Sequence, residues 1–113
     1  MHELSLATDV INLVTEEARK NGLSGIQEVL IEVGDLSGVE ADAFQWALEL
    51  LTKETILGKA EILLNRSPGT GICKSCEREF EMRNRLDSCP LCGAFPSEIR
   101  GGQEFRVISM VGE

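Results

Sequence analysis

Apolar residues near the start of the chain recur at intervals of three and four positions. This spacing predicts an amphipathic helix over residues 5–22, with one apolar stripe. The stripe consists of Ala7, Val10, Ile11, Val14 and Ala18. Arg19 and Lys20 suit the negative end of the helix dipole, and Gly22 supplies the stop. The chain therefore begins with a helix that has one face to bury.

The pattern then changes from the helical period to a period of two. Residues 26–34, IQEVLIEVG, alternate between apolar and polar positions and predict a half-buried strand. Its buried face is predicted to carry Val29, Ile31 and Val33. After the turn GDLSG, residues 40–53 return to helical spacing, with Phe44, Leu48 and Leu51 on one face. A strand and a second helix thus follow the first helix.

Two further apolar runs, residues 60–66 and residues 104–111, predict the second and third strands. Between these strands lies a window that contains all four cysteines. We therefore predict an α/β fold, in which two helices cover a small three-stranded mixed sheet, in the order α-β-α-β-(cysteine window)-β. The cysteine window has few apolar residues, so a cross-link is expected to hold it.

Composition and charge limit the possible partners. The chain has 113 residues and a net charge of −8, and it lacks the basic stripe that neutralises phosphates, so we expect no nucleic-acid partner. No run of about 18 apolar residues occurs, so no membrane span is expected. The acidic, charge-interrupted start argues against a secretory signal. The expected location is the cytoplasm.

The cysteines form two CxxC pairs, Cys73 with Cys76 and Cys89 with Cys92. Four thiolates in this spacing suit tetrahedral Zn²⁺ and leave no position open for water, which makes the site structural. Ligation supplies folding free energy, on the order of 10 kcal/mol in small zinc peptides. Gly93 permits a tight backbone turn after the second pair.

Other uses of the four thiols fit less well. A cytosolic setting disfavours two disulfides, and neither pair follows a thioredoxin-like strand-to-helix turn. A rubredoxin-like iron site would accept CPLCG, but the window has only Phe80 and Phe95 as aromatic residues. Two rival functions follow from these alternatives: a zinc ribbon that binds protein or nucleic acid, and an iron-containing electron carrier.

The segment Met1-His2-Glu3 contains the only histidine of the chain. The Met1 α-amine and the deprotonated His2 amide close a five-membered chelate ring, and that amide with imidazole Nδ1 closes a six-membered ring. Glu3 offers a fourth donor, through its amide or its carboxylate. Such planar nitrogen sets suit Ni²⁺ or Cu²⁺. Bulky His2 favours retention of Met1. The alternative is a frayed chain end without function.

Signs of catalysis are weak. A single histidine cannot supply a facial iron triad, and no serine or cysteine stands out as a nucleophilic partner for it. Glu16 and Glu17 fall on a solvated helix face without an acid–base signature. We therefore expect a protein that is not an enzyme.

Several segments together resemble a known family. MHELSL at the start, IEVGDLSGVE, TILGKAEI, the two CxxC pairs and the closing IRGGQEFRVISM occur in the order found in HypA/HybF nickel metallochaperones. The similarity covers essentially the whole chain. It implies a carrier that binds Ni(II) at its N terminus and delivers it during [NiFe]-hydrogenase maturation, with urease as another target.

The resemblance also implies site residues, domains and partners. His2 is the expected principal nickel ligand, assisted by Met1 and Glu3, and Glu40 is a further acidic candidate. The alternative for Glu40 is a carboxylate that the helix dipole favours in the first turn of the second helix. The nickel domain is expected over residues 1–68 plus 103–113, and the zinc module over residues 69–102. The GTPase HypB and the hydrogenase large subunit are the expected partners. Exchange of strands between chains would allow a homodimer.

Overall fold

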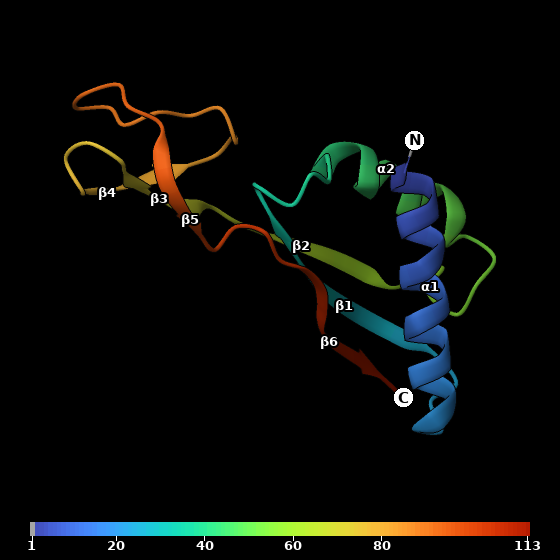
Figure 1. Ribbon diagram of the computed structural model, residues 1–113. Coiled ribbons are helices and arrows are strands. Elements are labelled where there is room, and N and C mark those ends of the chain that lie inside the picture. The colour runs from blue at the N-terminus through green and yellow to red at the C-terminus, as the bar shows by residue number, and fades with distance from the viewer. Residues whose placement is uncertain (1) are drawn as a thin grey trace. The chain divides into compact units, whose positions relative to one another are not determined.

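The computed structural model describes residues 2–113 (Figure 1). Two helices and six strands follow one another as α1 (His2–Lys20), β1 (Ile26–Gly34), α2 (Ala41–Leu51), β2 (Glu61–Ser67), β3 (Gly69–Cys73), β4 (Glu79–Met82), β5 (Pro96–Arg100) and β6 (Phe105–Gly112). The strands form two three-stranded sheets, with the orders β2-β1-β6 and β4-β3-β5. Among the described residues, no helix is both long enough and apolar enough to cross a bilayer.

The chain divides into two compact units. The first unit contains Met1–Ile31, Glu40–Asn65 and Arg106–Glu113, and the second contains Glu32–Val39 and Arg66–Phe105. The domain limits expected from the sequence stay a prediction. The segment 32–39 belongs to the unit that holds the cysteines, whereas the sequence placed this segment within the expected nickel domain.

The first unit packs α1 and α2 against a sheet whose central strand is β1 (Figure 1). The predicted stripe of α1 is buried at all five positions. The α2 residues Phe44, Ala47 and Leu48 are also buried, as is Val29 of β1. Burial of these side chains supplies most of the stabilisation of the unit. The predicted fold, two helices on a small three-stranded sheet, is confirmed.

Two elements differ from those predicted at one end. The first helix begins at His2, three residues before the predicted start, so it includes residues that were candidates for a frayed end. The second helix ends at Leu51, and this residue is exposed although its spacing predicted burial. A hydrogen bond from the Thr52 amide to the Leu48 carbonyl, 2.9 Å, closes that last turn.

The second unit is a small antiparallel sheet with its own core. Strand β3 pairs with β4 and with β5, so that Gly71 lies opposite both Phe80 and Ile99. The core cluster consists of Leu36, Cys73, Phe80, Met82 and Cys89. The sequence did not predict these strands because each is only four or five residues long and carries few apolar positions.

Leu36 joins this core from the segment that follows β1. Its amide donates to the Gly102 carbonyl at 2.7 Å, and its own carbonyl accepts from Arg85 at 2.8 Å. Close approach of the backbone requires glycine at two nearby positions. A Cβ on Gly69 would lie 2.1 Å from the Leu36 side chain, and one on Gly102, where φ is 74°, would lie 2.5 Å from the Gly69 nitrogen. The turn after β1 is therefore part of the second unit.

Candidate metal sites

Each CxxC pair forms a tight turn with the same backbone hydrogen bonds. In the first turn, the Glu77 amide donates to the Cys73 carbonyl at 3.1 Å, and the Cys73 amide donates to the Arg78 carbonyl at 2.8 Å. In the second, the Gly93 amide donates to the Cys89 carbonyl at 2.8 Å, and the Cys89 amide donates to the Ala94 carbonyl at 2.9 Å. The two pairs are thus built as equivalent knuckles.

Each knuckle places the residue after its second cysteine at a positive φ. Gly93 has φ of 76°, as the sequence predicts, and Glu77 has φ of 62°. Glutamate adopts this left-handed conformation only at an energetic cost, so the turn must fix it. The role of Glu77 was not predicted, although its position, which corresponds to that of Gly93, was the signal that could have revealed it.

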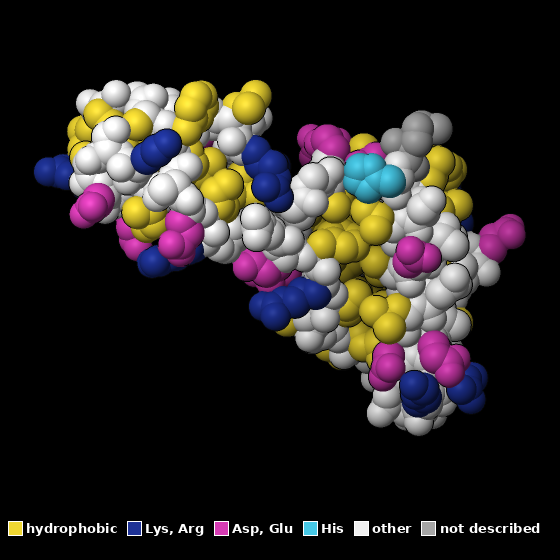
Figure 2. Space-filling model, viewed as in Figure 1, with side chains coloured by type: hydrophobic (Ala, Val, Ile, Leu, Met, Phe, Trp, Pro, Cys, Tyr) yellow, Lys and Arg dark blue, Asp and Glu magenta, His cyan; other side chains and the backbone are white. Residues whose placement is uncertain are grey.

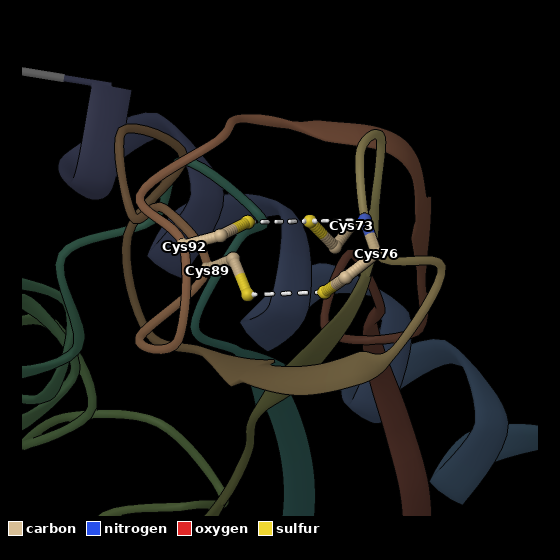
Figure 3. Close-up of side chains that lie close together, drawn as sticks. All are labelled: Cys73, Cys76, Cys89 and Cys92. Atoms are coloured by element: carbon tan, nitrogen blue, oxygen red, sulfur yellow. Dashed lines mark hydrogen bonds between the residues drawn. The ribbon is translucent and has the colours of Figure 1, made fainter.

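The two knuckles face one another and bring four sulfurs together (Figure 3). The Sγ atoms of Cys73 and Cys92 are 3.3 Å apart, those of Cys76 and Cys89 are 3.8 Å apart, and all four lie within 4.8 Å of one another. Zinc bound tetrahedrally at about 2.3 Å from each sulfur requires sulfurs about 3.8 Å apart. Cys73 and Cys89 are buried, and Cys76 and Cys92 are exposed. The cluster fits structural zinc.

Neighbouring groups shift the pKa values of Cys73, Cys76 and Cys92 in different directions. The pKa of Cys73 is lowered to about 6, chiefly because the Cys76 amide donates to its sulfur at 3.4 Å. The pKa of Cys92 is raised to about 11: a hydrogen bond from the Ala94 amide lowers it, but the shared hydrogen bond with Cys73, burial and the other two sulfurs together outweigh that bond. The pKa of Cys76 is also raised. The Cys73 thiolate therefore forms readily and makes Cys76 and Cys92 harder to ionise.

At the other candidate site, His2 and Glu3 occupy the first turn of α1. The His2 side chain is 58% exposed, and its Nε2 lies 3.3 Å from Oε2 of Glu3, whose side chain is 14% exposed. The pKa of Glu3 is lowered: partial burial raises it, but hydrogen bonds from the Glu3 and Glu40 amides outweigh that effect, and His2 adds a favourable charge interaction. The Glu3 carboxylate is therefore an anion beside the imidazole.

Glu40 lies at the start of α2, where its carboxylate caps the helix. Its Oε1 accepts from the Asp42 amide at 3.2 Å, and its Oε2 accepts from the Ala43 amide at 2.6 Å. Its own amide lies 3.4 Å from Oε2 of Glu3. Both carboxylate oxygens thus satisfy amides that have no partner within the helix. Through its backbone, Glu40 joins the beginnings of the two helices.

The proposed Met1 ligand lies outside the described residues. Within residues 2–113, the four cysteines are the only group of three or more His, Cys, Asp or Glu side chains close enough to share one ion. The side chains of His2 and Glu3 form a pair rather than such a group. A metal bound at the start of α1 must therefore take further donors from the main chain.

Comparison with known proteins gives these two features a context. A family model described as hydrogenase/urease nickel incorporation, metallochaperone, HypA matches residues 1–112. Hydrogenase maturation factor HypA of Geobacter metallireducens is 39% identical over 107 residues, which cover 95% of this chain and 94% of that protein. The HypA of Parabacteroides distasonis is 40% identical over 111 residues, which cover 98% and 96%.

Solved structures give the same result. The solution structure of the Ni metallochaperone HypA from Helicobacter pylori superimposes with a TM-score of 0.66, at 29% identity, over 99% of this chain and 97% of that one. Sequence, fold and the thiol cluster together define a nickel metallochaperone of the kind used in hydrogenase maturation. The chain belongs to the HypA family.

Proposed function

We propose that this chain captures Ni²⁺ at its own amino terminus and delivers it during [NiFe]-hydrogenase maturation, while Cys73, Cys76, Cys89 and Cys92 hold a structural zinc ion. One observation carries the proposal: the single imidazole of the chain stands exposed in the first turn of α1, against an anionic carboxylate. That arrangement supports an ion-binding amino terminus over a frayed end. Urease maturation is a second possible destination for the nickel.

The start of a helix is a suitable place for main-chain ligands. The first amides of an α-helix have no carbonyl four residues before them, so a metal that displaces the His2 amide proton breaks no helical hydrogen bond. The proposed donors are the Met1 α-amine, the His2 amide nitrogen and imidazole Nδ1, which together favour the planar geometry of Ni²⁺. The amide nitrogen of Glu3 completes the set, because the Glu3 carboxylate contacts the other ring nitrogen of His2, Nε2.

Glu3 has a second role in this proposal, as the residue that orients the imidazole. A histidine that binds a metal through one ring nitrogen commonly donates from the other nitrogen to a carboxylate. The contact between Nε2 and Glu3 leaves Nδ1 for the metal. Glu40, whose oxygens already cap α2, contributes its amide to Glu3 rather than a ligand.

Electrostatics make the bound ion easy to release. The amino end of a helix carries about half a positive charge, which opposes a cation. The deprotonated amide and the Glu3 carboxylate offset that repulsion. Protonation of the imidazole or the amine, or competition by ligands of a partner, tips the balance toward release. Such a site suits delivery of nickel better than storage.

The remaining parts of the proposal concern the cellular role. HypB and the hydrogenase large subunit are the proposed partners, and exchange of sheet strands between two copies is the proposed route to a homodimer. Four reduced thiols suit a cytoplasmic protein. A carrier whose zinc site has no open position needs no catalytic residues, so we propose that the chain is not an enzyme.

A transfer assay tests this function. Nickel-loaded chain is mixed with nickel-free precursor of the hydrogenase large subunit, and the nickel content of the separated proteins is measured. We expect nickel to move into the precursor from the native chain, and a His2→Ala chain that retains its zinc to deliver none. Equal delivery by both chains would rule out the amino-terminal site.

A further inference from the structure

Strand β6 is an edge of the first sheet, and its last six residues lack the usual protection of an edge. In the order β2-β1-β6, only one side of β6 faces another strand of the described chain. Natural edge strands discourage added strands with Lys, Pro or bulges. The only charged residue of β6 is Arg106, near its start, and the following residues 107–112, VISMVG, contain no charged residue and no proline. Both Ile108 and Val111 are exposed. This edge is therefore a template for another extended segment.

An apolar groove runs beside this edge within the first unit. It has a volume of about 250 Å³ and is lined by Leu13, Val14 and Glu17 of α1 and by Val107, Ser109 and Met110 of β6. Leu13 is 50% exposed. Figure 2 shows hydrophobic side chains gathered in a band along α1. A strand added to β6 would place alternate side chains over this groove, which is the arrangement of β-strand addition.

The groove lies on the same side of α1 as His2. Residues 2, 6, 13 and 17 are separated by four, seven and four positions, so they follow one side of a helix. His2 is eleven residues from Leu13, or about 16 Å along the axis. About five residues of extended chain span that distance. A segment bound in the groove can therefore reach the level of His2.

Charge distinguishes the possible occupants. The first unit carries five Lys or Arg against eleven Asp or Glu, a net charge of −6 over its three segments. A second copy paired through β6 would bring two such units together, whereas a cationic segment would be attracted. We infer that β6 and the groove bind an extended segment of another protein, with apolar residues at alternate positions and a net positive charge.

This surface would deepen the proposed nickel delivery. A partner held along β6 presents neighbouring residues to His2, so that competing ligands reach the ion at high effective concentration. That consequence rests on the proposed nickel site. Strand addition itself rests only on β6, the groove and the charge of the unit.

Binding of synthetic peptides to the zinc-loaded, nickel-free full chain tests the inference. The probes are the acetylated nonapeptides KVTVRVTVK and EVTVEVTVE, and the readout is amide hydrogen exchange with ¹⁵N spectra. We expect the cationic peptide to slow exchange at alternate amides of residues 107–111, and the anionic peptide to bind at least about tenfold more weakly. Leu13→Lys should weaken cationic-peptide binding by about tenfold or more, because it fills the groove with like charge.

Leu50→Lys is the matched control, since Leu50 is 48% exposed on α2 in the same unit and does not line the groove. It should leave peptide binding within about twofold of the native value. Three results would each overturn the inference. The first is no protection of residues 107–111 with 1 mM cationic peptide, the second is an equal effect of the two lysine variants, and the third is equal binding of both peptides. Concentration-dependent protection of β6 without peptide would assign the edge to a second copy instead. His2→Ala should retain peptide binding, so failure of the nickel site and failure of the groove are distinguishable.

Discussion

The Nε2 atom of His2 lies 3.3 Å from the Oε2 atom of Glu3 in the first turn of α1. The same carboxylate oxygen lies 3.4 Å from the Glu40 amide at the start of α2. The imidazole is thus oriented by a carboxylate that the second helix helps to hold. We propose that this arrangement of His2 and Glu3 prepares the start of α1 to bind a metal ion.

Replacement of Glu3 by glutamine tests that orientation. Loss of a carboxylate that orients a ligating histidine typically costs about 10–100-fold in metal affinity, so Glu3→Gln should weaken Ni²⁺ binding by that order. Calorimetric titration measures the change. Glu17→Gln, which neutralises another carboxylate of α1, is the control and should bind nickel like the native chain. Unchanged nickel affinity in Glu3→Gln would show that the Glu3 carboxylate does not contribute to nickel binding.

Glu40→Ser separates a helix cap from a metal ligand. Serine caps a helix by accepting an amide hydrogen bond at its hydroxyl oxygen, but it has no carboxylate. Because both Glu40 oxygens cap α2, we expect this variant to retain its stability and its nickel affinity. Glu40→Ala should lose about 1 kcal/mol of unfolding free energy, also without loss of nickel. Weak nickel binding by a stable Glu40→Ser chain would show that Glu40 is a ligand.

Leu36→Ala tests whether the turn after β1 belongs to the core of the second unit. Leu36 is 1% exposed among Phe80, Met82 and two cysteines, so its truncation should cost about 2–5 kcal/mol in chemical denaturation of the zinc-loaded chain. Leu86→Ala, at a side chain that is 80% exposed, should cost less than about 0.5 kcal/mol. Similar losses in the two variants would contradict the described core.

Zinc binding should release protons and strengthen as pH rises. At pH 7 the thiol of Cys73, with a pKa of about 6, is largely ionised in the metal-free chain, whereas Cys92, with a pKa of about 11, and Cys76, whose pKa is raised, are protonated. Zinc must displace the protons of those two thiols. Titration in weak buffer with a pH indicator should therefore detect at least two protons per zinc bound at pH 7. Release of fewer than two would contradict the assigned protonation states.

The parts of the structure that were predictable from the sequence are those with strong local signals. The stripe of α1 and the alternation of β1 each repeat often enough to fix the element and its buried face, and the CxxC spacing identifies the thiol cluster. Chelate chemistry alone left Ni²⁺, Cu²⁺ and a frayed chain end as alternatives at the amino terminus, and the family resemblance favoured nickel. The similarity to HypA proteins over 95% or more of the chain agrees with it.

Other parts depend on contacts between distant segments. The sequence GDLSG reads as an ordinary turn, and nothing local indicates that Leu36 packs with Met82, 46 positions later. The strands of the second unit are too short for periodicity to reveal them. The cap formed by Glu40 was only partly foreseen, because a favourable dipole position does not specify which amides the carboxylate accepts.

We propose that nickel binds through the free amino terminus and His2. Calorimetric titration of Ni²⁺ tests this binding mode in three tag-free chains: the native chain, His2→Ala, and a chain with one glycine added before Met1. A chain with one glycine added after Glu113 is the control. We expect about one nickel per native or control chain, and loss of most affinity in the other two variants, all with zinc retained. Native-like nickel binding by the chain extended before Met1 would contradict it.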